Sequence, residues 1–185
     1  MTTVRTFGHG TAGQDELLGR LQAAGIERVV DVRIAPGSKR HPHVGRDALS
    51  LWLPEAGIGY RWEKRLGGFR KLAPDSPDVA LRNDSFRAYA GHMRSSEFAE
   101  AIDALIVEAS DRAEAAVAVM CSESVWWRCH RRLVADFLVL ARDVKVEHLM
   151  PDGRLSPHVP TDGVRRRADG LLVYDAGASP LPGAG

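Results

Sequence analysis

The sequence predicts an α/β domain with a mainly parallel sheet, on three observations. Short apolar runs rich in valine, such as 28–32 and 116–120, suit buried strands. They alternate with segments whose apolar residues have helical spacing, and the chain begins strand, helix, strand. Its 185 residues fit one domain with a sizeable core. We therefore expect a three-layer, Rossmann-like domain with about five strands and helices on both faces.

The expected elements follow from these patterns in chain order. Strands are predicted at 3–7, 28–32, 58–62, 116–120 and 145–149. Helices are predicted at 15–24, 47–56, 86–93 and 96–109, and a last one from about Val125, with Trp126, Cys129, Leu133, Phe137 and Leu140 on its apolar stripe. Residues 1–150 are expected to form the single α/β domain. Residues 151–185 form a C-terminal extension, in which 171–174 adds an edge strand and the last eight residues are loose.

Composition narrows the class of protein. Hydrophobic residues make up 44% and charged residues 26% of the chain, which is ordinary for a globular protein. No apolar run is long enough to span a bilayer, and the first ten residues lack the apolar segment of a secretory signal, so we expect a cytoplasmic protein without a membrane partner. Basic residues crowd the first half and acidic residues crowd 97–114, which predicts a basic and an acidic face if these segments lie apart. The sequence does not set the oligomeric state.

The stretch 116–141 carries the densest chemistry. A buried strand ends at Cys121, and two thiols, a carboxylate, an imidazole, two tryptophans and three arginines follow within a dozen residues. In open α/β sheets ligands bind at the carboxyl ends of the strands. Polar groups from three strands should therefore converge there: His9, Asp31, Arg33, Cys121 and Glu123.

Each of these residues also has a purely structural interpretation. His9 suits a turn, and Asp31 and Arg33, two apart on a strand, suit a mutual ion pair. Cys129 lies on an apolar stripe and is favoured as core packing, whereas Cys121 suits either an inert or a reactive thiol. Glu123 near a helix amino terminus is stabilised there, but it is also placed for acid–base or nucleophilic work.

The sequence does not match the spacing of known ligand-binding loops. Six residues separate Cys121 from Arg128, whereas a phosphatase-type loop has five between its cysteine and arginine. There is no dinucleotide fingerprint and no nucleotide P-loop. Seven residues separate the two cysteines, too many for a zinc knuckle. We expect no metal and no cofactor, with a metal bound by Cys and His left open.

Several short motifs occur together in a recognisable order. They are Gly8-His9, Asp31-Val32-Arg33 with Pro36 and Ser38, Leu66-Gly67-Gly68, Cys121-Ser122-Glu123 and Cys129-His130-Arg131. Together they resemble the bacterial family named domain of unknown function 488, over nearly the whole chain. Two departures are Gly10, where the family usually has serine, and Ser124-Val125, where an acidic residue and proline are common. The resemblance implies an α/β fold but no established reaction.

The sequence favours an enzyme that hydrolyses a glycosidic bond or a phosphate ester of a nucleotide or nucleic acid. Its predicted catalytic residues are Glu123, His9 and Asp31. Its predicted substrate-binding residues are Arg33, Ser38, Tyr60, Trp126, Trp127, His130 and Arg131. The basic pairs Lys39-Arg40 and Lys64-Arg65 would flank the cleft. Two alternatives stay open: a thiol- or metal-dependent enzyme that uses Cys121, Cys129 and His130, and a nucleic-acid-binding module without catalysis.

Overall fold

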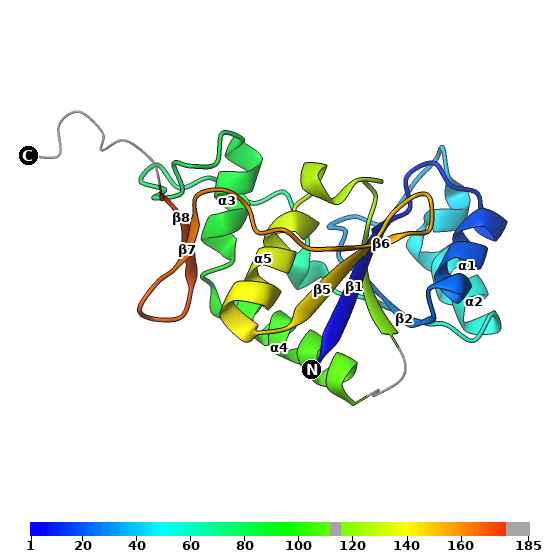
Figure 1. Ribbon diagram of the computed structural model, residues 1–185. Helices are drawn as coiled ribbons and strands as arrows, with labels where there is room; N and C mark the ends of the chain where they lie inside the picture. The colour runs from blue at the N-terminus through cyan, green and yellow to red at the C-terminus, as the bar shows by residue number, and fades with distance from the viewer. Residues whose placement is uncertain (112–115, 177–185) are drawn as a thin grey trace, which may run out of the picture.

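A six-stranded sheet forms the centre of the protein (Figure 1). The computed structural model describes residues 1–111 and 116–176. Five strands are parallel: β1 (Thr3–Gly8), β2 (Ile26–Asp31), β3 (Gly59–Trp62), β4 (Ala116–Cys121) and β5 (Lys145–Leu149). A short antiparallel strand that the sequence analysis missed, β6 (Leu155–Pro157), completes the order β3-β2-β4-β1-β5-β6. The predicted mainly parallel α/β fold is thereby confirmed.

Helices cover both faces of this sheet (Figure 1). Helices α1 (Gln14–Ala23) and α2 (Arg46–Glu55) pack on one face, and α3 (Asp84–His92), α4 (Ser96–Ser110) and α5 (Arg131–Arg142) on the other. The central strand β4 sends Ala118 and Met120 to the first face and Val117, Val119 and Cys121 to the second. Both faces of β4 are buried, which explains its continuous apolar run. Cys121 therefore ends the strand on the side of α5.

The predicted last helix is wrong in its first turn. Instead of a helix from Val125, the chain forms a 3-10 turn over Trp126–Arg128, and α5 begins only at Arg131. Cys129 is extended, with φ −122° and ψ 153°, so Trp126 and Cys129 are not on the apolar stripe of a helix. The extended residue sets Cys129 directly before the amino end of α5, where free backbone N–H groups are available.

The chain after β5 returns to the core. Strands β7 (Val164–Arg166) and β8 (Leu172–Tyr174) pair with each other in a separate two-stranded sheet, so the strand predicted at 171–174 does not extend the edge of the main sheet. Leu172 and Tyr174 instead pack into the core on the side of α3 and α5. The last eight residues, predicted to be loose, lie outside the described residues.

The acidic helix lies beside several of the basic residues rather than apart from them. Glu108 of α4 pairs with Arg28 and with Arg61, in each case over 2.8 Å. Arg65 pairs with Glu63 over 2.8 Å. These arginines are therefore already neutralised by carboxylates of the protein. Among the described residues, no helix is long and apolar enough to cross a membrane.

Candidate active site

A cavity of about 280 Å³ opens at the carboxyl ends of β1, β2 and β4. Segments that are far apart in the sequence line it, and Gly68 and the exposed Phe69 are among its lining residues. Six of the residues singled out from the sequence are among those that line it: His9, Arg33, Ser38, Cys121, Cys129 and His130. The expected convergence of strand ends thus produces one small cavity that contains both thiols.

The loops after β1 and β4 lie directly against each other. His9 and Gly10 donate backbone hydrogen bonds to the carbonyls of Cys121 and Ser122, each over 3.0 Å. A Cβ atom on Gly8 would lie 1.6 Å from the carbonyl oxygen of Glu123, a distance that no side chain tolerates. The Gly8-His9 motif therefore exists because only glycine allows these two backbones to approach so closely.

Asp31 and Arg33 form a buried ion pair behind the cavity. The guanidinium of Arg33 donates to both carboxylate oxygens of Asp31, over 2.8 and 2.7 Å. Tyr60 also donates its hydroxyl to Asp31, over 2.6 Å. That bond and burial raise the pKa of Tyr60, with burial the larger cause. Neither Asp31 nor Tyr60 lines the cavity; Asp31, which Tyr60 holds, orients Arg33, which does.

His9 is held as a neutral acceptor. Its Nδ1 lies 2.9 Å from the carbonyl oxygen of Gly10 and must carry the proton, since a carbonyl only accepts. Its Nε2 then accepts from Nη1 of Arg33, over 3.3 Å. Burial lowers the pKa of His9 to about 4. His9 therefore stays uncharged at neutral pH, with both ring nitrogens already hydrogen-bonded.

The two cysteines meet at the cavity wall. Their sulfur atoms lie 2.8 Å apart, and Cys129 also lies 3.5 Å from Nδ1 of His130 and 3.5 Å from the backbone N–H of Arg131. The bond with Cys121 is the largest cause that lowers the pKa of the Cys129 thiol well below its usual value, and His130 and Arg131 add to it. Burial raises the pKa of Cys121. The arrangement favours a thiolate at Cys129 and a thiol at Cys121.

Arg131 does not line the cavity but lies beneath it. Its side chain is 1% exposed, Nη2 donates to the carbonyl of Glu123 over 3.0 Å, and Nη1 donates to Thr6 over 3.4 Å. Its Nε has no hydrogen-bond partner, and no carboxylate of the described residues pairs with it. A buried, unpaired guanidinium is costly unless an anion compensates it. Its attraction adds to the causes that lower the pKa of Cys129 and only partly opposes the burial that raises the pKa of Cys121.

Glu123 occupies a different position from the one that its predicted role requires. Its side chain is exposed, is not among the residues that line the cavity, and has no hydrogen-bond or ion-pair partner among the described residues. Its backbone carbonyl, by contrast, accepts a hydrogen bond from Arg131. The local contribution of Glu123 is made through its main chain.

The tryptophans also lie outside the cavity lining. The ring of Trp126 stacks on that of His148, with centroids 4.4 Å apart and planes at 6°. Trp127 contacts Trp126 edge-on and is 46% exposed. Trp126 is thus occupied by an internal partner, and Trp127 is the one indole that is open to solvent here.

A buried polar chain next to Trp126 was missed in the sequence. His148 Nδ1 lies 2.6 Å from the Thr6 hydroxyl, His148 Nε2 lies 2.9 Å from His158, and His158 lies 2.8 Å from Asp136. Thr6 in turn accepts from Arg131. The available signal was Asp136, a carboxylate inside the apolar stripe of α5 that needed buried partners.

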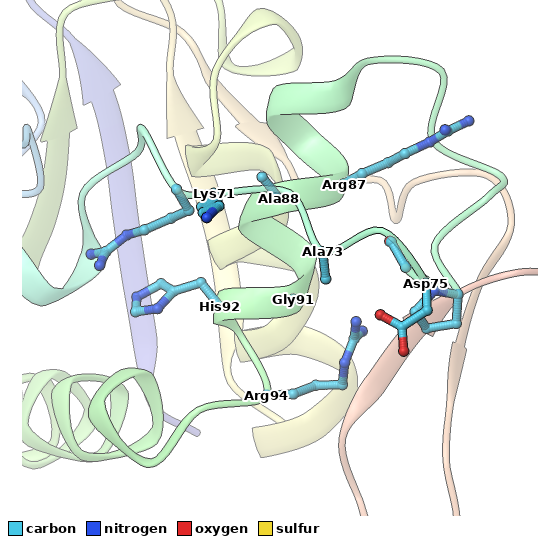
Figure 2. Close-up of a pocket in the computed structure, with 11 residues that line it drawn as sticks. Lys71, Ala73, Asp75, Arg87, Ala88, Gly91, His92 and Arg94 are labelled. Carbon is cyan, nitrogen blue, oxygen red and sulfur yellow. The ribbon is translucent and has the colours of Figure 1, made fainter.

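A larger hollow of about 490 Å³ lies between α3 and the segment 70–77. The guanidinium groups of Arg87 and Arg94 end apart from each other, as Figure 2 shows. Arg94 forms two hydrogen bonds with Asp78, over 3.0 and 2.6 Å, and Arg70 donates to the carbonyls of three residues in 64–67. This hollow therefore lacks a convergent set of free donors.

The described residues do not form a cluster of side chains with the composition of a metal site. Within residues 1–111 and 116–176, no group of three or more His, Cys, Asp or Glu side chains could hold a metal ion. Cys121, Cys129 and His130 are therefore better described as a thiol pair beside an imidazole.

Comparison with known proteins gives the family. Neither the curated proteins nor the solved structures contain a match to this chain. One family model does match, that of the domain of unknown function DUF488, over residues 14–138. This range includes Arg33, Cys121 and the Cys129-His130-Arg131 motif, and it covers more than half of the chain. The chain therefore belongs to the DUF488 family.

Proposed function

We propose that this protein is a thiol-dependent enzyme whose nucleophile is Cys129. The observation that carries the proposal is the thiol pair at the wall of the cavity, with His130 and the amino end of α5 directed at the Cys129 sulfur. Hydrogen bonds from ring and backbone N–H groups stabilise a thiolate, and the thiolate is the nucleophilic form. Cys129 would attack an electrophilic atom of a small molecule in the cavity.

The burial of Arg131 adds to the support for the same proposal. Its charge has no carboxylate partner among the described residues, yet it lies next to the two thiols. A thiolate at Cys129 supplies the missing negative charge, so each group stabilises the charged form of the other. An inert pair of neutral thiols would leave this guanidinium uncompensated.

The nucleotide hydrolase predicted from the sequence receives less support. Glu123 is exposed and outside the cavity lining, and its proposed helper His9 has both ring nitrogens occupied. A nucleic-acid-binding module would depend on free cations, of which Lys39 and Arg40 are exposed beside the cavity while Arg65 is paired. Binding of single- and double-stranded oligonucleotides at two salt concentrations tests that module, because phosphate contacts weaken steeply with salt.

Alkylation with iodoacetamide across pH 4–9 tests the nucleophile. The chain has only two cysteines, so mass spectrometry assigns each product. In Cys121→Ser, which keeps a hydroxyl donor beside Cys129, we expect alkylation to remain fast at pH 6. In Cys129→Ser, the buried Cys121 should react slowly and only at alkaline pH. Equal, alkaline-dependent alkylation of both variants would contradict the proposal.

A further inference from the structure

We infer that Cys121 and Cys129 form a two-electron dithiol/disulfide couple that reduces a small hydroperoxide in the cavity. This inference rests on the proposed nucleophile and adds a second thiol and a substrate class. Cys121 is 1% exposed and its sulfur lies 2.8 Å from that of Cys129. A thiol in that position is shielded from outside molecules but is in contact with whatever forms on Cys129. Its chemistry is therefore directed at its neighbour.

The reaction is balanced in two steps. The Cys129 thiolate attacks the terminal oxygen of the hydroperoxide, so that an S–O bond forms, the O–O bond breaks, and the departing alkoxide takes a proton from solvent to become an alcohol. The Cys121 thiol then loses its proton, and its sulfur attacks the oxidised sulfur of Cys129. The S–S bond forms, the S–O bond breaks, and hydroxide leaves with that proton as water. Two sulfurs are oxidised, one peroxide is reduced, and two molecules of a small thiol restore the dithiol.

Arg33 offers a donor for the leaving alkoxide. A guanidinium carries five N–H groups. Asp31 accepts from Nε and Nη2, Val44 accepts the second N–H of Nη2, and His9 accepts one from Nη1. One N–H of Nη1 then has no partner among the described residues, on a side chain that lines the cavity. His9 accepts a hydrogen bond from Nη1 but carries no negative charge of its own, so it does not neutralise the guanidinium.

The size of the cavity limits the substrate. A volume of about 280 Å³ and an 8% exposed Cys129 admit a small molecule but not a disulfide that is part of a folded protein. The first step requires only that one oxygen atom reach the sulfur. A hydroperoxide satisfies this requirement with the smallest entering group.

The buried Arg131 predicts which form of the couple is preferred. In the dithiol form the Cys129 thiolate compensates the guanidinium, whereas the disulfide is neutral and leaves it uncompensated. A couple whose reduced form is stabilised in this way is an oxidising one, and its disulfide is easily reduced. We therefore expect small thiols to regenerate the pair readily.

Two probes test the couple on the full chain, hydrogen peroxide and hydroxyethyl disulfide. With hydrogen peroxide, mass spectrometry of the wild type should find one Cys121–Cys129 disulfide per chain. In Cys121→Ser, the same treatment should leave a sulfenic acid on Cys129 that dimedone traps. Peroxide that oxidises Cys129 in the wild type without forming the disulfide would overturn the couple, while alkylation at pH 6 would still support the nucleophile. A disulfide formed by hydroxyethyl disulfide alone would overturn the substrate class.

A redox titration of the wild type tests the expected preference for the dithiol form. In a glutathione buffer poised at the potential of protein disulfide isomerase, which lies between those of structural disulfides and of the most oxidising couples, we expect the pair to be mainly dithiol. A structural disulfide would be almost fully oxidised under these conditions. A pair that is mainly disulfide would therefore overturn the charge argument.

Discussion

Arg131 donates a hydrogen bond to the backbone carbonyl of Glu123 over 3.0 Å, and this contact links the two halves of the central stretch. It fixes the loop after β4 above a buried positive charge. Glu123, which was expected to act through its carboxylate, is therefore held in place through its main chain. The reactive group that this geometry selects is the sulfur of Cys129, between the loop and α5.

The Glu123 side chain should be dispensable for thiol reactivity. We expect Glu123→Gln to keep the wild-type rate of Cys129 alkylation and to change the free energy of unfolding by less than about 0.5 kcal/mol, because the substitution is exposed and unpartnered. Alkylation kinetics and urea unfolding measure both. If Glu123 were a general base, turnover of a substrate would instead fall by about a hundred- to ten-thousand-fold.

Removal of the buried positive charge should raise the pKa of Cys129. We expect Arg131→Met to slow alkylation at pH 6 by about tenfold or more, since one pKa unit changes the thiolate fraction tenfold below the pKa. The pH at which alkylation reaches half its maximal rate measures the shift. Arg131→Lys, which keeps a charge, is the control and should retain a lower pKa than Arg131→Met. Circular dichroism checks that both variants fold.

The sequence predicted the convergence at the strand ends because topology alone determines it. Parallel strands joined by helices place their carboxyl ends on one edge, which brings His9, Arg33 and Cys121 together whatever the loops do. Topology does not determine the conformation of the loop between β4 and α5. The spacing of Trp126 and Cys129 suited a helix, but the extended backbone of Cys129 turns its sulfur toward Cys121.

The buried polar chain was beyond prediction for a different reason. Asp136, His158 and His148 are 22 and 10 residues apart in the sequence and come from a helix, a loop after β6 and a strand. Their contacts depend on the return of the chain after β5 to the core. The unpaired burial of Arg131 was equally hidden, because the sequence showed it only as one of several arginines.

Replacing Gly8 should lower the stability of the protein. We expect Gly8→Ala to lower the free energy of unfolding by about 3 kcal/mol, because its Cβ would overlap the carbonyl of Glu123 and the backbone would have to move. The matched control is Gly19→Ala in α1, where no atom outside the helix's own backbone and the two chain neighbours lies within 4 Å of the new Cβ. This control should gain about 0.5–1 kcal/mol from helix propensity. Equal stabilities of the two variants in urea would contradict the predicted overlap.

Stability should fall as the pH drops below about 6.5, and His148 should be one cause. Burial, with smaller repulsion from His158 and Arg131, lowers the pKa of His148 to about 2. The unfolded chain binds a proton at this residue near its ordinary value, whereas the folded chain does not, so its contribution is complete above pH 6.5 and is lost as the pH falls toward 2.

The expected slope for His148 is about 1.4 kcal/mol per pH unit between pH 6 and 4. His9, whose pKa is about 4, adds a similar slope that ends near that value. His148→Gln should therefore have a lower stability at neutral pH, because Thr6 and His158 lose a partner, but a dependence on pH that is shallower by one proton. Urea unfolding of both proteins at pH 7, 6, 5 and 4 measures the two slopes. Parallel curves would show that His148 takes up its proton in the folded protein as readily as in the unfolded chain.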